Sequence, residues 1–459
     1  MGLAVTNNLI ATSDAPLIVG LGSTGLSCAR FFHRQGIPFS VVDSRDNPPG
    51  LEALRRECPE AELVLGDIPP ARLQQAGQLI VSPGIAISHP AIAAAREQGV
   101  PVCGDIDLFM AQAQAPVVGI SASNGKSTVT ELFGRMARRA GITVAVGGNL
   151  GPPALDLLSD DMELYVLELS SFQLERAGDL GLEVACLLNI SPDHMDRHST
   201  MLEYHAAKQR IFRACKSLVY NRDEALTRPL QADTVSSWSF GFGEPDFHDF
   251  GLRQHKGEEW LYYAFERLMP VAEVALVGRH NVANALAALA LGQALKLPLP
   301  AMLEELREFR GLRHRSQVVA DVAGVHYIND SKATNPAATC AALAGFAADQ
   351  NLVLIAGGQG KGADFSELCE KIPASCRAVV LLGEDADALE QILAGSLPIL
   401  RAVSMQDAVG LAADFANPGD TVLLSPACAS FDMFSGFAER GEKFTAAVQQ
   451  LLNGGASSD

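Results

Sequence analysis

A lysine between a glycine and a serine is the strongest chemical signal in this chain. Gly125, Lys126 and Ser127 follow an apolar run at residues 117–118 and precede a helical pattern, which is the setting of a phosphate-binding loop. In such loops backbone N–H groups surround the phosphates, the lysine reaches the β- and γ-phosphates, and the serine hydroxyl meets Mg²⁺. The standard spacing asks for glycine at Ile120, but the core and its setting still predict nucleotide binding.

A second glycine-rich turn, Gly20-Leu21-Gly22-Ser23-Thr24-Gly25, lies near the N-terminus. It follows a strand-like run and leads into a helical pattern, and Asp43 ends the next apolar run. This arrangement matches the dinucleotide fingerprint, in which a helix N-terminus faces a pyrophosphate. A uridine diphosphate group carries a pyrophosphate too, so the turn alone leaves a nucleotide sugar and a nicotinamide cofactor both open.

Four further side chains, which lie after the phosphate loop and before the last third of the chain, are candidates for metal or phosphate chemistry. Glu168 ends an apolar run in the same block as the phosphate loop, where a carboxylate suits Mg²⁺, although a lone acid there is more often a cap or solvated. His194 and His198 have the spacing of a metal pair on a helix, but the loop setting favours a structural role for His198. By default Lys208 is interpreted as a solvated cation.

Polar and basic residues follow several apolar runs in the last third of the chain. Arg315 suits the stabilisation of a transferred phosphoryl group, and Lys361 suits a substrate carboxylate. Grouped together, these segments provide the basic and hydroxyl groups that a site for an anionic substrate needs; they are residues 312–315, 329–336, 357–361 and 425–430.

The elements that must position these residues are strands alternating with helices. This alternation predicts an α/β fold with mostly parallel sheets, whose ligands sit beyond the carboxyl ends of strands. A stretch richer in aromatic and turn residues, 233–277, is predicted to be antiparallel, and a helix is predicted from about 281 to 297. The predicted strands are residues 17–19, 41–42, 79–81, 117–118, 165–167, 185–190, 352–355, 379–382 and 422–424.

Length and composition bound the possible classes of protein. The chain has 459 residues, of which 48% are hydrophobic, so we expect three domains, at 1–104, 105–311 and 312–459, and no disordered or fibrous chain. The net charge of −18 disfavours nucleic-acid and anionic-membrane partners. No apolar run is long enough to span a membrane, and the first residues lack a secretory pattern. Nine cysteines without CxxC predict reduced thiols in a cytoplasm rather than disulfides or zinc.

Taken together, these motifs resemble the Mur ligases of peptidoglycan synthesis. The resemblance covers nearly the whole chain, and NDSKATN and SPACAS point to the member of the family that adds D-glutamate. The ordered pieces are GLGSTG, SPGIAISHP, SNGKST, GGNLG, LELSSFQLE, DHMDRH, RHNVANALAALAL, LRHR, NDSKATN, GGQGKGADF and SPACASFD.

The resemblance implies a Rossmann-like N-terminal domain that binds UDP, a central ATPase domain of the phosphate-loop type, and a Rossmann-like C-terminal domain that brings the incoming amino acid. ATP would phosphorylate the carboxylate of UDP-N-acetylmuramoyl-L-alanine, and the amine of D-glutamate would attack the acyl phosphate, giving an amide, ADP and phosphate. Two Mg²⁺ ions are implied as cofactors. We expect a cytoplasmic monomer with no nucleic-acid partner and no membrane insertion.

The resemblance also assigns site residues. The contacts with the uridine nucleotide that it implies are Ser23, Thr24, Asp43, Ser44, Arg45, Gly84 and Asn149. The ATP contacts that it implies are Asn124, Gly125, Lys126, Ser127, Thr128, Asn284, Arg315 and Asp330. The D-glutamate contacts that it implies are His194, Thr334, Lys361, Ser430 and Phe437. The implied metal ligands are Ser127, Glu168, His194 and Lys208, the last as a carbamate, and the implied catalytic residues are Lys126, Glu168, His194 and Lys208.

One position departs from the family pattern, and other functions compete with this interpretation. Ala122 stands where the family loop carries glycine, and alanine would be strained there if the backbone needed a positive φ. Within the ligase class, another Mur ligase or a folylpolyglutamate-type synthetase is the alternative. A nicotinamide-dependent oxidoreductase would explain the first glycine turn alone, and a phosphate-loop kinase or NTPase that binds a partner protein would explain the second.

Overall fold

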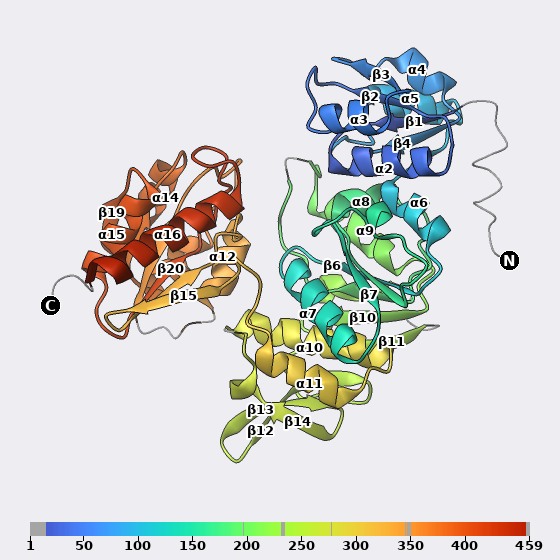
Figure 1. Ribbon diagram of the computed structural model, residues 1–459. Helices are drawn as coiled ribbons and strands as arrows, with labels where there is room; N and C mark the ends of the chain where they lie inside the picture. Colours follow the sequence, from blue (N-terminus) through green and yellow to red (C-terminus); the bar gives the residue numbers. More distant parts are fainter. Residues whose placement is uncertain are drawn as a thin grey trace. The chain divides into compact units, whose positions relative to one another are not determined.

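The computed structural model describes residues 15–195, 197–230, 235–276, 278–344, 346 and 350–455, and these form three β-sheets with helices packed on them (Figure 1). The residues group into two compact bodies. The first comprises the described residues of Met1–Ile190, Arg197–Leu268 and Leu286–Glu305, and the second those of Ser191–Asp196, Met269–Ala285 and Leu306–Asp459. The predicted lack of a secretory segment at residues 1–14, and positions 233, 234 and 277 of the predicted antiparallel stretch, lie outside the described residues.

The first sheet is parallel throughout, in the order β3-β2-β1-β4-β5. The chain moves outward from β1 on one side and then returns to place β4 on the other side, so a topological switch point lies at the carboxyl ends of β1 and β4. The strands are β1 (Pro16–Val19), β2 (Ser40–Asp43), β3 (Glu62–Leu65), β4 (Gln78–Val81) and β5 (Val102–Cys103). The helices are α2 (Ser23–Arg34), α3 (Leu51–Glu57), α4 (Pro70–Gln75) and α5 (Pro90–Glu97).

The second sheet has the order β14-β13-β12-β11-β10-β9-β6-β8-β7. It is parallel from β7 to β12, and β12 and β13 form an antiparallel pair. The antiparallel prediction is therefore correct for that pair and wrong for β11, which pairs in parallel with β10. The strands are β6 (Val117–Ser121), β7 (Val144–Gly148), β8 (Leu164–Glu168), β9 (Val184–Leu187), β10 (Ser217–Asn221), β11 (Ser236–Phe240), β12 (Asp249–His255), β13 (Glu258–Tyr263) and β14 (Glu266–Pro270).

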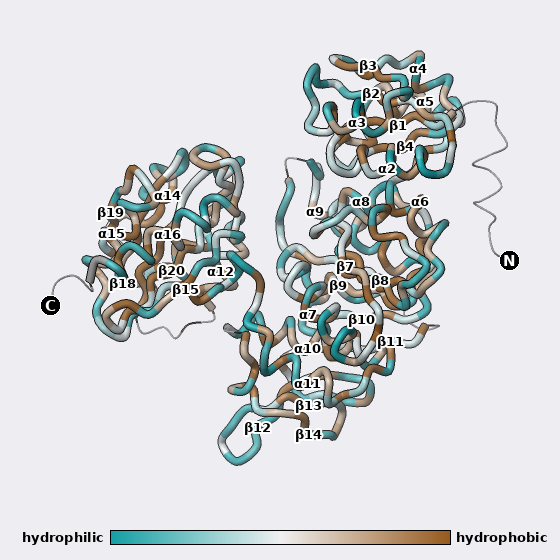
Figure 2. Tube along the Cα trace, viewed as in Figure 1, coloured by the Kyte–Doolittle hydropathy of each residue, from teal (hydrophilic) through white to brown (hydrophobic). Residues whose placement is uncertain are grey.

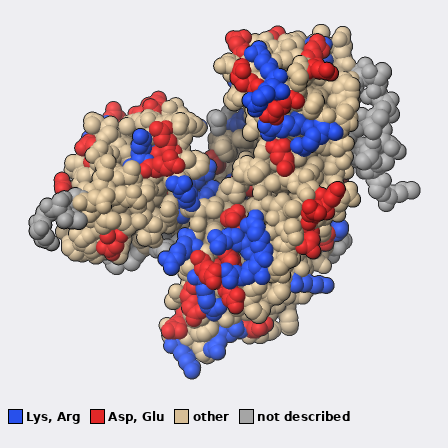
Figure 3. Space-filling view, in the orientation of Figure 1, with Lys and Arg blue, Asp and Glu red and all other residues tan. Residues whose placement is uncertain are grey.

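The helices of this part of the chain are α6 (Asp105–Gln112), α7 (Lys126–Arg139), α8 (Ser171–Arg176), α9 (Met201–Gln209), α10 (Arg279–Ala294) and α11 (Leu299–Glu308). Arg135 and Arg139 on α7 both contact the buried carboxylate of Glu305 on α11, at 2.6 and 2.8 Å. Basic and acidic atoms accordingly lie side by side over these helices in Figure 3. Part of the positive charge of α7 is therefore paired within the molecule.

The third sheet has the order β15-β16-β20-β17-β18-β19 and is parallel except at β15. Its switch point lies between β17 and β20. The strands are β15 (Gln317–Val322), β16 (Val325–Asn329), β17 (Leu352–Ala356), β18 (Cys376–Leu381), β19 (Ile399–Arg401) and β20 (Thr421–Leu424). The helices are α12 (Pro336–Leu343), α13 (Leu368–Ser375), α14 (Ala386–Leu393), α15 (Met405–Phe415) and α16 (Phe437–Gly455). The predicted α/β fold with mostly parallel sheets is confirmed.

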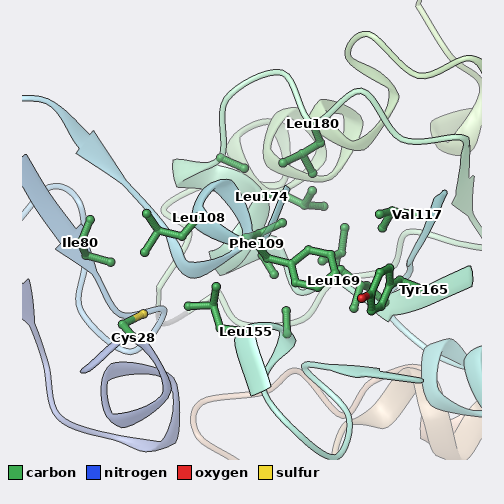
Figure 4. Packing of buried hydrophobic residues seen from close by; sticks show 14 of the residues in the cluster. Cys28, Ile80, Leu108, Phe109, Val117, Leu155, Tyr165, Leu169, Leu174 and Leu180 are labelled. Carbon is green, nitrogen blue, oxygen red and sulfur yellow. The ribbon is translucent and has the colours of Figure 1, made fainter. Parts of the chain in front are cut away.

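The first two sheets share one hydrophobic core. Buried side chains from α2 and β4, such as Cys28 and Ile80, belong to the same cluster as Phe109 and Tyr165 beside the second sheet (Figure 4). The third sheet has separate clusters on its two faces. In Figure 2 the apolar residues accordingly follow the central strands of each sheet. The first sheet and the second are therefore expected to depend on each other for stability.

The nine cysteines are all free thiols in this structure. Seven are buried, and Cys103 and Cys369 are half-buried. Burial raises the pKa of Cys376 and Cys428 to about 12. Among the described residues, none of the helices combines the length and apolar character of a membrane span.

Candidate active site

The phosphate loop joins β6 to α7, as the sequence predicts. Gly125 caps the helix with φ 83°, a left-handed conformation that favours glycine, and α7 begins at Lys126. Ala122 is fully buried and does not have a positive φ. The steric penalty that alanine would pay in a left-handed conformation therefore does not arise, and the loop accommodates this departure from the family pattern.

Asn189, just beyond β9, holds the loop from the side and was missed by the sequence reasoning. Its Oδ1 accepts a hydrogen bond from the Asn124 backbone N–H at 2.8 Å, and its Nδ2 donates to the Asn124 carbonyl at 2.9 Å. The Ser123 N–H donates to the Asn189 carbonyl at 3.0 Å. Its position after an apolar run was the available signal, because β9 lies next to β6 in the sheet.

Two lysine side chains converge on one carbonyl at the carboxyl end of β6. The Lys126 Nζ donates to the Ala122 carbonyl at 2.6 Å and to the Ser123 carbonyl at 2.9 Å. The Lys208 Nζ donates to the same Ala122 carbonyl at 2.7 Å and lies 4.8 Å from the Tyr204 ring centroid. Lys208 is only 1% exposed, so its default interpretation as a solvated cation is wrong.

Glu168 lies beside the start of α7. Its Oε2 accepts a hydrogen bond from the Ser127 hydroxyl at 2.5 Å, and its Oε1 accepts one from the Asn149 amide at 2.6 Å. A carboxylate and a hydroxyl beside a phosphate loop fit Mg²⁺, which usually takes one or two carboxylates together with substrate phosphates. Among the described residues, no group of three or more His, Cys, Asp or Glu side chains is arranged to hold a metal ion.

The two histidines of the DHMDRH segment have different surroundings. His198 is buried, with its Nε2 3.0 Å from the Ser171 hydroxyl and its ring stacked on Phe172, which agrees with a structural role. His194 has φ 58° and a half-exposed side chain whose Nε2 lies 3.7 Å from Asp193. It belongs to the second body and Glu168 to the first, so its role as a metal ligand stays a prediction.

The first glycine turn lies at the switch point of the first sheet. Gly20 has φ 96°, and a Cβ on Gly25 would lie 1.9 Å from the Gly20 carbonyl oxygen, so both positions require glycine. The helix α2 begins at Ser23, and its N-terminal N–H groups suit a pyrophosphate. The predicted contacts Ser23, Thr24 and Gly84 are exposed or half-exposed, as a binding surface requires.

Asp43 and Arg45 form a buried-to-surface ion pair at the end of β2. The Arg45 Nη2 lies 2.7 Å from Asp43 Oδ2, and the Leu21 backbone N–H donates to the same oxygen at 2.6 Å. Burial alone would raise the pKa of Asp43, but these hydrogen bonds outweigh burial and hold the pKa below its usual value. Ser44, between them, is exposed. Asn149, the remaining predicted uridine contact, instead donates its amide to Glu168.

In the third domain, the loops after β17 and β20 meet at the switch point. Gln359 and Ala429 exchange two backbone hydrogen bonds of 2.9 Å. This pairing brings together the segments that carry Lys361 and the buried Ser430, and the Lys361 Nζ lies 5.1 Å from the Phe431 ring centroid.

Phe437 begins α16, and the Lys332 Nζ lies 3.9 Å from its ring centroid. Thr334, two residues after Lys332, is half-buried. These positions keep a cation next to the predicted D-glutamate contact Phe437, as an acidic substrate would need.

A buried carboxylate follows β16. Asp330 accepts hydrogen bonds from the Ser316 N–H and the Ser425 hydroxyl, both at 3.0 Å. Burial raises the pKa of Asp330 to about 6, against the lowering effect of these hydrogen bonds and of Arg315. Asn284 donates its amide to Asn281 at 2.9 Å. The structure thus places Asp330 and Arg315 close together, whereas it gives Asn284 a partner on its own helix.

Arg440 on α16 was also missed by the sequence reasoning. Its buried guanidinium donates to the carbonyls of Cys428, Ala429 and Ser331 at 2.7 to 3.3 Å. Burial lowers the pKa of Arg440 to about 10. An arginine inside a helical pattern gave no signal, because periodicity does not show which carbonyl groups lie opposite.

The chain is similar to three family models along its length. They are described as the Mur ligase MurD-like N-terminal domain over residues 14–104, the Mur ligase middle domain over 120–292, and the Mur ligase glutamate ligase domain over 314–428. The UDP-N-acetylmuramoylalanine–D-glutamate ligases of Pseudomonas aeruginosa and Pseudomonas fluorescens are 54% and 53% identical, each over 97% of this chain and 100% of the relative. That of Marinobacter nauticus is 49% identical over the same shares.

Solved structures with 17% identity share the fold. The MurF ligase of Thermotoga maritima, in complex with ADP, has a TM-score of 0.60 over 91% of this chain and 95% of its own. The pseudomurein peptide ligase type C of Methanothermus fervidus has a TM-score of 0.59 over 96% and 100%. Full-length identity of about half, three matching domains and a shared fold lead to one conclusion: this chain belongs to the Mur ligase family.

Proposed function

We propose that this chain is an ATP-dependent ligase that joins D-glutamate to UDP-N-acetylmuramoyl-L-alanine. The observation that carries the proposal is the grouping of Lys126, Ser127 and Glu168 at the carboxyl end of β6 and β8, in a chain about half identical to ligases of that name. A free carboxylate is a poor electrophile, so it must first gain a phosphate leaving group before an amine can attack it.

Each residue of this grouping has a role that its geometry supports. The Lys126 ammonium now pairs with two loop carbonyls, and turning it toward the β- and γ-phosphates would place its charge where negative charge develops. Ser127 and Glu168 would hold Mg²⁺, which neutralises charge on the transferred phosphoryl group. Gly125 and the first turn of α7 offer backbone N–H groups to the phosphates.

We extend the proposal to two Mg²⁺ ions and to carbamylation of Lys208. In that reaction the neutral amine attacks the carbon of CO₂, and the loss of one proton leaves an anionic carbamate. The support is the burial of the Lys208 amine 3.4 Å from the Ser121 hydroxyl and beside the carbonyl that Lys126 also contacts. A carbamate would replace repulsion between two cations with an attraction, and it would add oxygen ligands, which Mg²⁺ prefers.

We also propose the two substrate pockets at the other switch points. The uridine nucleotide would lie against Ser23, Thr24, Asp43, Ser44, Arg45 and Gly84, with Asn149 reaching it from beside Glu168. D-glutamate would lie against Thr334, Lys361, Ser430 and Phe437, with His194 nearby, and ATP would also meet Asn284, Arg315 and Asp330. These assignments follow the family resemblance, and the location at strand ends of open parallel sheets supports them.

The proposal also covers the domain boundaries, the location in the cell and the oligomeric state. We place the domain boundaries after residues 104 and 311, because β5 ends at Cys103 and β15 begins at Gln317. Free thiols and nucleotide substrates support a location in the cytoplasm, and we propose that the protein is a monomer there.

The test is phosphate release by the full chain with UDP-N-acetylmuramoyl-L-alanine, ATP and Mg²⁺, with and without D-glutamate. We expect release that requires D-glutamate and that Lys126→Ala abolishes. Release with L-alanine, meso-diaminopimelate or a folate instead would assign another ligase of the same class. ATP hydrolysis without any amino acid would favour a plain NTPase, and binding of NAD(P)H instead of UDP would favour an oxidoreductase.

A further inference from the structure

Arg176, the last residue of α8, has a buried guanidinium that contacts two separate parts of the first body. A guanidinium has five N–H groups to donate, and here each one has a backbone carbonyl as its acceptor. The Nε group donates to Phe172 in its own helix at 2.6 Å. The Nη1 and Nη2 groups donate to the loop after β4, with acceptors Val81 at 3.0 Å, Ser82 at 2.5 Å, Pro83 at 3.5 Å and Ile85 at 3.2 Å.

This arrangement is expensive for the folded state. The nearest carboxylate oxygen, on Glu175, lies 3.6 Å away, and burial lowers the pKa of Arg176 to about 10. A buried cation held mainly by carbonyl dipoles costs free energy that an apolar side chain would avoid. The presence of this buried cation is explained if the function of the protein needs the conformation that Arg176 imposes on the loop.

The loop of residues 82–85 belongs to the proposed uridine-nucleotide pocket. The Ser82 hydroxyl donates to the Gly20 carbonyl at 2.8 Å, which ties the loop to the first glycine turn. A second guanidinium, that of Arg197, donates to the Gly84 carbonyl at 3.2 Å and lies 4.8 Å from the Phe172 ring centroid. The loop is thus attached on one side to the pyrophosphate turn and on the other to α8.

The opposite end of α8 adjoins the phosphate chemistry. Glu168 ends β8, and Ser170 caps α8 by accepting a hydrogen bond from the Gln173 N–H while Gln173 Oε1 accepts one from the Ser170 N–H. Glu168, the partner of Ser127, lies two positions before this capping box, and Arg176, the partner of the loop, lies three positions after it. Because the helix is short and capped, the two ends are held in a fixed relation.

We infer that Arg176 is a positioning residue, which holds the loop of residues 82–85 in the conformation that the uridine nucleotide meets and fixes that loop to the segment that presents Glu168. The inference deepens the proposed function and rests on it. Arg176 acts through its neighbours, since all five of its N–H groups are already used by backbone carbonyls. A lysine, with three donors on one nitrogen, cannot replace this pattern.

The experiment compares Arg176→Met and Arg176→Lys with the control Arg210→Met in the full chain. Arg210 also donates its guanidinium to carbonyls of α8 and its end, those of Leu174 at 2.8 Å and Ala177, but it has no bond to the loop. The measurements are the dissociation constants of UDP and of Mg-ADP by calorimetry, KM and kcat for phosphate release, and the unfolding midpoint.

We expect Arg176→Met to raise the dissociation constant of UDP and the KM for the UDP substrate by about tenfold or more and to lower kcat, with Mg-ADP affinity within about twofold of the wild type. For Arg176→Lys we expect a UDP dissociation constant, KM and kcat between those of the wild type and those of Arg176→Met. Arg210→Met should leave UDP affinity unchanged. UDP affinity and kcat in folded Arg176→Lys or Arg176→Met equal to those of Arg210→Met would overturn the inference.

The proposed function fails separately from this inference. A wild-type chain that releases no phosphate with both substrates would remove the ligase activity while the UDP titrations still report on the loop. An active wild type whose Arg176 variants behave like the control would remove only the role of Arg176.

Discussion

The carbonyl of Ala122 shows how strongly charge is concentrated at the proposed phosphate site. It accepts hydrogen bonds from the ammonium groups of both Lys126 and Lys208. Two cations around one oxygen repel each other, and more strongly inside a protein than in water. A bound polyanion such as a triphosphate, or the proposed carbamate of Lys208, would relieve this repulsion. The site is therefore prepared for negative charge before any substrate arrives.

Replacing the second of these lysines tests its proposed role. We expect Lys208→Ala to lower kcat by about a hundredfold or more, since a buried group close to the phosphates is lost, and to regain activity on addition of short carboxylates such as acetate or formate. Phosphate release measures both effects. The control is Lys216→Ala, because Lys216 is exposed and pairs only at the surface with Glu183. Full activity of Lys208→Ala without any added carboxylate would exclude the role.

A second prediction at this scale concerns the buried carboxylate at the start of α6. Burial raises the pKa of Asp105 from 3.8 to about 6, although Gln173 donates a hydrogen bond to it at 3.2 Å. The folded state therefore binds more protons than the unfolded state between these values, and the stability that this supplies is lost as pH rises through about 6.

Asp105→Asn keeps the acceptor and removes the titration. From about pH 4 to about pH 7.5 we expect the variant to gain stability relative to the wild type by up to about 3 kcal/mol, measured as the difference in unfolding free energy at each pH. Asp385→Asn, on a carboxylate that accepts a bond from the Gly360 N–H in the second body, serves as the comparison. A difference between wild type and Asp105→Asn that does not change with pH would contradict the shift.

At the scale of elements, all three sheets place candidate residues at a topological switch point. Each sheet is parallel around its centre, and each has neighbouring strands whose connections leave in opposite directions. The candidate residues stand just after those strands: the glycine turn after β1, the phosphate loop after β6, and the paired loops after β17 and β20. Residues far apart in the chain are grouped because the sheets group the ends of their strands.

The pairing of the last two loops depends on a glycine. Gly358 has φ 128°, and a Cβ there would lie 2.2 Å from the Ala429 carbonyl oxygen. We expect Gly358→Ala to separate the loops, to raise the KM for D-glutamate by about tenfold or more, and to leave the UDP dissociation constant unchanged. Gly362→Ala is the control, because Gly362 also has a positive φ but its Cβ would meet open space. Equal effects of the two substitutions would mean that backbone strain alone, rather than loop pairing, matters.

The sequence predicted these elements well where a pattern is local. Runs such as 352–355 and 422–424 are strands, because a continuous apolar run of that length suits a strand buried on both faces. Order and register are not local, so the partners of the loops could not be derived. The default interpretation of Lys208 as a solvated cation was wrong for the same reason: its helix carries no strong apolar stripe, and only the packed structure shows that Lys208 is buried against the end of β6. Arg176 and Arg440 donate mainly to backbone carbonyls that are distant in the sequence, and a sequence does not show which carbonyl groups lie opposite a side chain.

At the scale of the whole molecule, the core that joins the first two sheets is the main cooperative feature. Phe109 on α6 is fully buried, and its ring meets that of Tyr165 on β8 edge to face, with centroids 5.0 Å apart. The third sheet has its own clusters. We therefore expect the described part of the chain to unfold as two units, with the first two sheets in one and the third sheet in the other.

Matched cavities test this division. Phe109→Ala should cost about 3–5 kcal/mol and lower only the calorimetric transition of the unit that contains the first two sheets. Phe444→Ala, which removes a ring that is equally buried beside the third sheet, should lower only the other transition. Transitions that move together in both variants would show that the molecule unfolds as a single cooperative unit.

The burial of the cysteine thiols has a consequence for the design of inhibitors of this protein. An electrophilic warhead needs a sulfur that is both reachable and readily ionised, and burial raises the pKa of most of the cysteines far out of that range. Alkylating compounds are therefore poor choices against buried thiols such as Cys376 and Cys428, whereas the half-buried Cys369 is more reachable. Inhibitors of this protein are instead expected to be anions that compete for the proposed substrate sites at the strand ends.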